Sequence, residues 1–74
     1  MSFNEVLPLL AAGKKVIRSG WEGSEQYIFL VNDATYHGEA INPYFLIKTD
    51  EVPSLSMFQP TSCDLLATDW QVVE

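Results

Sequence analysis

Residues 13–23 read GKKVIRSGWEG, and this stretch decides how the rest of the chain is organised. It contains three of the four basic residues, one of the two tryptophans and three of the four glycines. Gly13 follows an apolar helical run and is typical of a helix stop, because glycine adopts the left-handed conformation without strain. Residues 14–18 then predict a short strand, with Val16 and Arg18 on one face.

Trp21 lies in the turn that follows this strand, between Gly20 and Gly23. Glycines let the backbone bend tightly there, so the indole can be presented outward as a stacking surface for a base. The alternative is that the indole fills the core of a small domain. Trp70 differs, because it alternates with Val72 in an apparent strand and is therefore predicted to be a core residue.

The chain has 74 residues, which predicts one small domain with little room for a hydrophobic core. Domains of this size usually need a further source of stability. A disulfide is excluded because Cys63 is the only cysteine, and no cluster of cysteine and histidine suggests a metal site. With 47% hydrophobic residues the chain suits self-association, so we predict a homo-oligomer without a metal or cofactor.

The net charge of −6, from 10 acidic and 4 basic residues, disfavours binding to DNA, RNA or an anionic membrane. No apolar run of about 18 residues predicts a membrane span, and the first residues lack the pattern of a signal peptide. A single cysteine is also typical of proteins in a reducing compartment. These features together predict a cytoplasmic protein.

The residues on either side of the central stretch predict an α+β fold. Ser2 and Glu5 form a capping-box pattern, so a helix should begin there, with Pro8 kinking or shortening it. A second capping box, Thr61 with Asp64, predicts a short helix near the C-terminus. Apolar, aromatic and β-branched runs predict a small antiparallel sheet of four or five strands, formed by residues 14–18, 26–31, 44–49, 55–58 and 70–73.

The sequence also predicts the environment of one strand and the structure of one long connection. Residues 26–31 are apolar almost throughout, as in a strand that is covered on both faces. Residues 32–43 form a polar connection of about the greatest length that a compact domain tolerates. We expect this connection to be an unstructured loop that is either functional or disordered.

The side chains that can meet the phosphates of a ligand are the four cations, Lys14, Lys15, Arg18 and Lys48. Lysines on a half-buried strand are more often a solvated face, so both interpretations stay open. Asp64 suits a ribose hydroxyl or an exocyclic amine, and the alternative is that it serves only as the cap of the second helix.

Catalysis is the weaker interpretation of the sequence. His37 lies in the long connection, where a general base is conceivable but a solvated histidine is more common. Cys63 lies at a predicted helix start, where a nucleophile is conceivable. One histidine and one cysteine do not establish a catalytic pair, and neither a P-loop nor a dinucleotide fingerprint is present. We therefore predict that the protein is not an enzyme.

Two blocks of the sequence resemble a known family of phage proteins. The first is Gly-Lys-Lys to Gly-Trp-x-Gly within residues 13–23, and the second is Asp-Leu-Leu-Ala-x-Asp-Trp at residues 64–70. With Phe3, Tyr27 and Pro60 in the same order, they make nearly the whole chain similar to the second Thoeris anti-defence family, long catalogued as a domain of unknown function.

This resemblance implies a sponge that sequesters a signalling nucleotide without cleaving it and thereby blocks host Thoeris signalling. Members of the family form homotetramers and hold cyclic ADP-ribose isomers made by host immune enzymes, and some relatives hold cyclic oligonucleotides. Glu22 stands where the family commonly has asparagine. The residues that the resemblance implies as ligand-binding are Gly20, Trp21, Glu22, Gly23, Pro60, Thr61 and Asp64, with Tyr27, Arg18 and Lys48 in second rank.

A different class of function also fits the composition. An acidic decoy would bind a host protein by presenting carboxylates in place of phosphates, and the −6 charge supports it. However, the acids are scattered along the chain rather than arranged in a row, and a decoy leaves Trp21 and its glycines without a role. Replacing Trp21 should abolish ligand capture by a sponge and leave a decoy almost unchanged.

Overall fold

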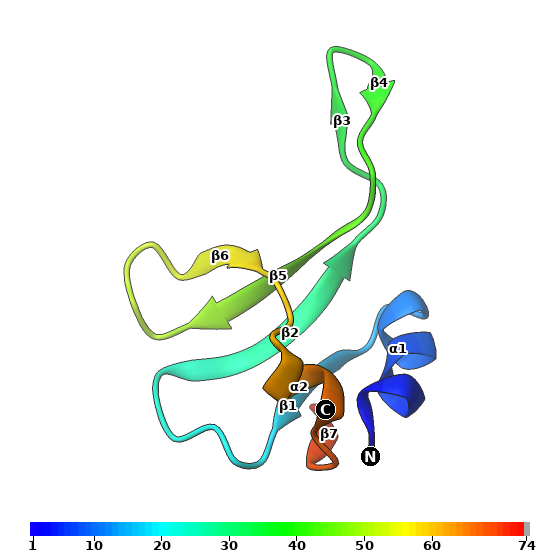
Figure 1. Ribbon diagram of the computed structural model, residues 1–74. Coiled ribbons are helices and arrows are strands. Elements are labelled where there is room, and N and C mark those ends of the chain that lie inside the picture. The colour runs from blue at the N-terminus through cyan, green and yellow to red at the C-terminus, as the bar shows by residue number, and fades with distance from the viewer. Residues whose placement is uncertain (74) are drawn as a thin grey trace.

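Two helices and seven strands make up the computed structural model, which describes residues 1–73 (Figure 1). Five of the strands form one antiparallel sheet, and both helices begin at the predicted capping boxes. The predicted α+β class is therefore confirmed. In chain order the elements are α1 (Phe3–Ala11), β1 (Lys15–Arg18), β2 (Glu25–Val31), β3 (Thr35–Tyr36), β4 (Glu39–Ala40), β5 (Tyr44–Thr49), β6 (Leu55–Phe58), α2 (Ser62–Leu66) and β7 (Trp70–Val73).

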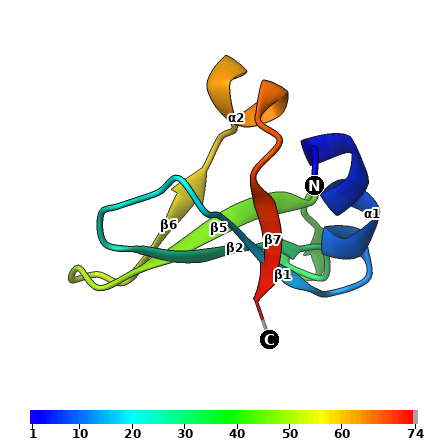
Figure 2. The same cartoon turned by 90° about the horizontal axis from the view of Figure 1, so that it is seen from below.

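The main sheet has the strand order β6-β5-β2-β1-β7, and every neighbouring pair is antiparallel. Ile28 of β2 lies opposite both Val16 of β1 and Ile47 of β5, and Val16 also lies opposite Val72 of β7. Side chains of directly paired residues share one face, so these four form an apolar face. Both helices lie on that side of the sheet, and no helix within residues 1–73 lies on the other side (Figure 2).

The hydrophobic core fills the space between this face and the helices. Its fully packed members are Phe3, Val6, Leu10, Val16, Ile28 and Trp70. The Phe3 ring lies 5.3 Å from the Trp70 ring and 6.4 Å from the Phe45 ring, both in edge-to-face contact. The predicted core role of Trp70 is thus confirmed. The expectation that residues 26–31 are covered on both faces is wrong for the single chain, because Ile28 is the one buried residue of β2.

Both ends of α1 are set by residues close to them in sequence. The Ser2 hydroxyl accepts a hydrogen bond from the Glu5 amide (3.3 Å), and the Glu5 carboxylate accepts one from the Ser2 amide (2.9 Å). The predicted capping box is therefore confirmed. At the other end Gly13 has a φ of 94°, and the Lys14 amide donates to the Leu9 carbonyl, as in a Schellman motif.

Pro8 does not shorten α1, so that part of the prediction is wrong. The helix continues through Pro8 to Ala11. Because proline has no amide hydrogen, the Asn4 carbonyl four residues earlier loses its usual partner in the helix. Asn4 and Pro8 are both exposed, so water can bind that carbonyl and the helix is maintained.

The segment 32–43 forms a hairpin rather than an unstructured loop, which corrects the prediction. β3 and β4 pair in antiparallel register around His37 and Gly38. Those two residues have φ angles of 50° and 83°, and two successive positive φ angles are typical of a type I′ turn. This turn matches the twist of the flanking strands, so a short hairpin forms and projects from the sheet as an arm (Figure 1).

Removing the cap of α1 gives a first test of this account. We expect Ser2→Ala to lower the free energy of unfolding by about 1 kcal/mol, because the Glu5 amide loses its side-chain acceptor and keeps only the Ser2 carbonyl, at 3.1 Å. For a domain of this size, that change lowers the melting temperature by roughly 4–8 °C in thermal denaturation followed by circular dichroism. Asn4→Ala, in the same turn but outside the capping box, is the control. Equal melting temperatures for the two variants would contradict the role given to Ser2.

Candidate functional site

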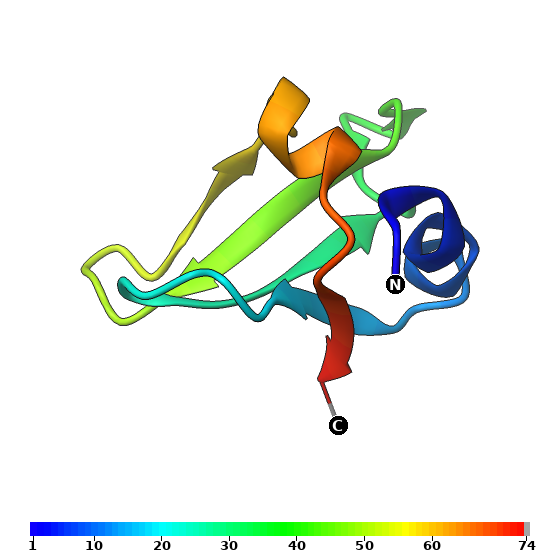
Figure 3. The same ribbon diagram turned by 60° about the horizontal axis from the view of Figure 1, so that its bottom comes forward.

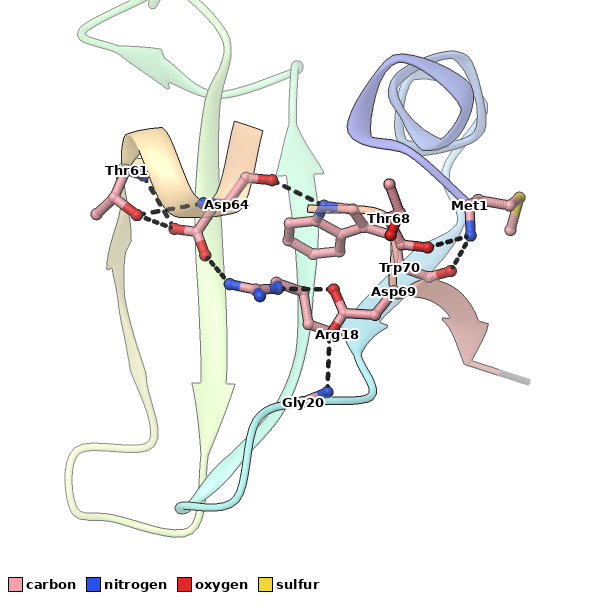
Figure 4. A network of polar contacts seen from close by, with 8 residues as sticks. All are labelled: Met1, Arg18, Gly20, Thr61, Asp64, Thr68, Asp69 and Trp70. Atoms are coloured by element: carbon pink, nitrogen blue, oxygen red, sulfur yellow. Dashed lines mark hydrogen bonds and ion pairs between the residues drawn. The ribbon is translucent and has the colours of Figure 1, made fainter. Parts of the chain in front are cut away.

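Arg18 is the centre of a polar network that joins three parts of the chain (Figure 4). Its Nε donates to Asp69 Oδ1 at 2.9 Å, and its Nη1 donates to Asp64 Oδ1 at 3.0 Å. Arg18 ends β1, Asp64 lies in α2, and Asp69 directly precedes β7. The planar guanidinium has donors in fixed directions, so it can hold two carboxylates in one geometry. It therefore links β1 to α2 and to the start of β7.

Asp64 belongs to this network and also caps α2. Its Oδ2 accepts hydrogen bonds from the Thr61 amide (2.9 Å) and the Thr61 hydroxyl (3.0 Å), and its own amide donates to that hydroxyl at 3.3 Å. Asp64 is 7% exposed. Burial acts to raise the pKa of this carboxyl, but the hydrogen bonds from Thr61 and Arg18 outweigh burial, so the pKa lies below its ordinary value. The predicted capping role of Asp64 is confirmed.

Asp69 holds the turn that carries Trp21. Its Oδ2 accepts a hydrogen bond from the Gly20 amide at 2.8 Å, and a Cβ at Gly20 would lie 2.8 Å from that same oxygen. A side chain at this position would displace the Asp69 carboxylate that Arg18 holds, so glycine favours this close approach. The hydrogen bond from Arg18 is the largest cause of the lowered pKa of Asp69. We did not predict Asp69 as a site residue, and its presence in the Asp-Trp pair at residues 69–70 is the sequence signal that could have indicated it.

Trp21 packs against the core on one side and remains partly exposed. Its ring lies 5.4 Å from that of Trp70 and 6.0 Å from that of Phe58, both edge to face. Trp70 is in turn fixed by the hydrogen bond from its Nε1 to the Asp64 carbonyl, at 3.0 Å in the interior. The two interpretations of Trp21 are therefore compatible. Its packing holds the ring in one position, and a half-buried indole still offers area to a ligand.

The turn around Trp21 has its glycine amides already engaged. The Gly20 amide is bound by Asp69, and the Gly23 amide donates to Glu25 Oε2 at 3.0 Å. Glu22 and Gly23 are exposed. Because these two amides have intramolecular acceptors, the turn offers a ligand an aromatic side chain rather than a row of free backbone donors.

The remaining predicted site residues divide between the two sides of the sheet. Pro60 and Thr61 directly precede α2, so they lie on the same side as the Arg18 network. Tyr27 and Lys48 are paired across β2 and β5, and they alternate with residues of the core face. They therefore point to the opposite side, where Lys48 Nζ donates to Ser54 Oγ at 2.9 Å. Within one chain, the structure does not bring Tyr27 or Lys48 to Trp21.

The two candidate catalytic residues lie in separate parts of the fold. His37 is at the turn of the β3–β4 hairpin, and its ring lies 4.2 Å from that of Tyr36. Cys63 is exposed on α2, which lies far from the hairpin in Figure 1. In the described part of the chain, no three histidine, cysteine or acidic residues are grouped so as to hold a metal ion. No helix of residues 1–73 has the length and apolar character that crossing a membrane requires.

The lowered pKa values of Asp64 and Asp69 predict how stability depends on pH. Each carboxylate is stabilised in the folded state, so each contributes stability above its unfolded pKa of about 3.9. This contribution is lost as the pH falls through the lower folded value. We expect the free energy of unfolding, measured in urea, to decrease below about pH 4.

The matched variants for this pH series are Asp69→Asn and Asp33→Asn. Asp69→Asn should partly flatten the dependence below about pH 4, because one of the three carboxyls with a lowered pKa is then absent, the others being Asp64 and Glu5. Asp33 is exposed and precedes β3, outside the network, so Asp33→Asn should retain the wild-type slope. A slope that Asp69→Asn leaves unchanged would contradict the assignment.

The chain is similar to known proteins over nearly its whole length. The family model described as the Thoeris anti-defense 2-like domain matches residues 1–73. The protein Thoeris anti-defense 2 of Bacillus phage SP01 is 36% identical over an alignment 85 positions long. The alignment covers 99% of this chain and 94% of that relative, so it includes the Trp21 turn and the Arg18 network.

Proposed function

The chain belongs to the Thoeris anti-defense 2-like family of immune-evasion proteins, and we propose that it captures a cyclic ADP-ribose-type nucleotide without cleaving it. The observation that carries this proposal is the partly exposed Trp21, held against Trp70 and Phe58 beside the Arg18 network. A nucleotide base stacked on an aromatic side chain contributes about 1–3 kcal/mol. A ring that is already fixed loses little conformational entropy when the base binds.

The polar wall of the proposed site is formed by the residues around α2. Pro60 and Thr61 face the ligand, while Arg18 and Asp64 position the wall through their mutual ion pair. The turn that carries the indole is formed by Gly20, Glu22 and Gly23. The carboxylates of Asp64 and Asp69 are occupied by hydrogen bonds from Arg18, Thr61 and Gly20, so neither is free to act as a general acid or a general base. This supports capture rather than catalysis.

The affinity that a sponge requires supports a site shared between copies. Nanomolar binding requires about −12 kcal/mol, and a ligand of about 35 heavy atoms at about −0.3 kcal/mol per atom supplies about −10.5 kcal/mol. Nearly all of its atoms must therefore make contact, while Trp21 and α2 cover one side. A second copy supplies the other side in the proposed homotetramer. Tyr27 and Lys48, on the opposite face, would contribute to a ligand held by a neighbouring copy.

The proposed partners are thus a small cyclic nucleotide and further copies of this chain. The net charge of −6 disfavours DNA, RNA and anionic membranes. The proposed place of action is the host cytoplasm, where the signalling nucleotide is made and read.

The test is to mix the protein with a glycocyclic ADP-ribose isomer and to isolate the complex by size-exclusion chromatography. The complex is then denatured by heat, and the released small molecule is identified by mass spectrometry. Recovery of the intact nucleotide in stoichiometric amount would support capture without turnover. An altered product would make the protein an enzyme. No retained nucleotide would contradict the proposal and direct the search to cyclic oligonucleotides or, as for a decoy, to a basic host protein.

A further inference from the structure

The turn that carries Trp21 is tied to the rest of the fold by a residue from a distant segment, Asp69. The connection between α2 and β7 runs beside the end of β1, where this turn begins (Figure 3). The Asp69 carbonyl accepts a hydrogen bond from the Ser19 amide at 2.9 Å, and its carboxylate accepts one from the Gly20 amide at 2.8 Å. The Trp21 amide donates to the Arg18 carbonyl at 3.1 Å. Three successive amides are thus bonded, two of them to Asp69.

Asp69 is in turn held by Arg18. The guanidinium Nε donates to Asp69 Oδ1 at 2.9 Å, which leaves Oδ2 for the Gly20 amide. Nη1 of the same guanidinium donates to Asp64, so Arg18 is also anchored to α2 (Figure 4). The side chains of Arg18 and Asp69 are 21% and 28% exposed, so their ion pair is partly shielded from water. A continuous series of contacts therefore leads from α2 through Arg18 and Asp69 to the backbone of the Trp21 turn.

The charge of Arg18 is already compensated within the protein. One guanidinium faces two carboxylates, those of Asp64 and Asp69, so the three groups together are net negative. A phosphate that approached Arg18 would be repelled by both carboxylates. Two donor directions of the planar guanidinium are also in use. Arg18 is therefore better suited to orient other residues than to bind an anion itself.

Side-chain packing by itself leaves the backbone of the turn unconstrained. The Trp21 ring has edge contacts with Phe58 and Trp70, and residues 19–24 belong to neither a helix nor a strand. Without the hydrogen bonds to Asp69, this segment would sample more backbone conformations. It would have to be ordered again when a base stacks on the indole, and that loss of conformational entropy opposes binding.

We propose that Arg18 is a positioning residue, which acts on the affinity for the captured nucleotide through Asp69 and the Trp21 ring and not through its own charge. The inference rests on the proposed capture function and deepens it, because it separates the residue that contacts the base from the two that hold it in place. It also gives Arg18 a different role from that of a cation for the phosphates of the ligand.

A first experiment compares two replacements of Arg18, one that keeps the charge and one that removes it. Arg18→Lys retains a cation but lacks the planar fork that serves two carboxylates, and Arg18→Gln lacks both. Isothermal titration calorimetry with a cyclic ADP-ribose isomer should show about a tenfold loss of affinity for each, which corresponds to about 1.4 kcal/mol. If Arg18→Lys binds within about twofold of the wild type, the charge is sufficient and the inference is overturned.

A second experiment asks whether Asp69 acts through Trp21. Asparagine has one carbonyl oxygen, so Asp69→Asn cannot accept from both Arg18 and Gly20. The substitution should lower affinity about tenfold in the wild-type background and less than about twofold in the Trp21→Ala background. Asp33→Asn, outside the network, should change affinity in neither. Equal losses from Asp69→Asn in the two backgrounds would overturn the inference, and circular dichroism checks that each variant is folded.

A third experiment needs no nucleotide. In the wild-type protein, the Gly20 amide should exchange its hydrogen at least about tenfold more slowly than the Gly38 amide at the hairpin tip, after correction for intrinsic rates. Nuclear magnetic resonance resolves the two amides. Arg18→Lys should speed the exchange of Gly20 at least about threefold and leave that of Gly38 unchanged, because Arg18 holds the acceptor of Gly20. Equal rates for the two glycines in the wild type would overturn the inference.

The exchange and affinity measurements distinguish the two proposals. If Arg18→Lys releases the Gly20 amide but the wild-type protein retains no nucleotide, the hold on the turn is supported and the capture function fails. If the wild type and Arg18→Lys capture the nucleotide equally well, capture is supported and the positioning role of Arg18 fails.

Discussion

Trp21→Ala should lower the affinity for the captured nucleotide about 100-fold, because the base loses its stacking surface. The indole is partly exposed, and its position is fixed by edge contacts with Trp70 and Phe58. Isothermal titration calorimetry with a cyclic ADP-ribose isomer measures the change directly. Trp21→Phe retains a flat ring and should keep most of the affinity.

The control for this prediction must separate binding from folding. Trp21 packs on the core, so Trp21→Ala is also expected to lower stability, and binding is measured only under conditions where circular dichroism shows a folded variant. Tyr36→Ala removes another exposed aromatic ring, at the hairpin, and should bind as the wild type does. A folded Trp21→Ala protein with wild-type affinity would refute the stacking role and favour the acidic decoy.

Trp70→Ala should cost about 3–5 kcal/mol of stability, which is comparable to the entire free energy of unfolding of many small domains. Trp70 is fully buried, and its ring contacts both Phe3 of α1 and Trp21 of the turn. The substitution therefore leaves a cavity where helix, sheet and turn meet. In urea denaturation at 25 °C, we expect this variant to be largely unfolded without denaturant.

Trp70→Phe is the sharper form of this test, because the core keeps an aromatic ring. The variant loses the hydrogen bond from Nε1, while the Asp64 carbonyl keeps the Ala67 amide as a donor, at 3.4 Å. The loss of one hydrogen bond costs about 0.5–1.5 kcal/mol, so the free energy of unfolding should fall by at least about that amount. Tyr36→Phe, at a ring that is 67% exposed, should change it by less than about 0.5 kcal/mol. A Trp70→Phe variant as stable as the wild type would show that the hydrogen bond is unimportant.

The features that the sequence predicted well depend on residues close together along the chain. The capping boxes of Ser2 with Glu5 and of Thr61 with Asp64 each join residues three positions apart, and Gly13 ends α1 by its own backbone conformation. Such signals need no knowledge of the rest of the fold. The β3–β4 hairpin is also formed by residues close together in sequence. Its turn, at residues 36–39, is short and lies within a polar segment, so the sequence predicted a loop there instead.

The polar network could not be predicted, because its members are far apart in sequence. Arg18 and Asp69 are separated by 51 positions, and Gly20 and Asp69 by 49. The order of the strands, β6-β5-β2-β1-β7, brings β1 beside β7 and so places these residues together. Composition and spacing indicated Arg18 and Asp64 as candidates, but they did not indicate that each is the other's partner.

The sequence by itself determined the α+β class, the two helix starts, the core role of Trp70 and the family to which the chain belongs. Only the tertiary structure decided which candidate residues lie together. Side chains alternate between the two faces along β2 and β5, so Tyr27 and Lys48 point to one side of the sheet. Trp21 and α2 lie on the other side. The physical reason is that side-chain direction depends on pairing register and on which face the helices cover, and both are set by contacts between distant segments.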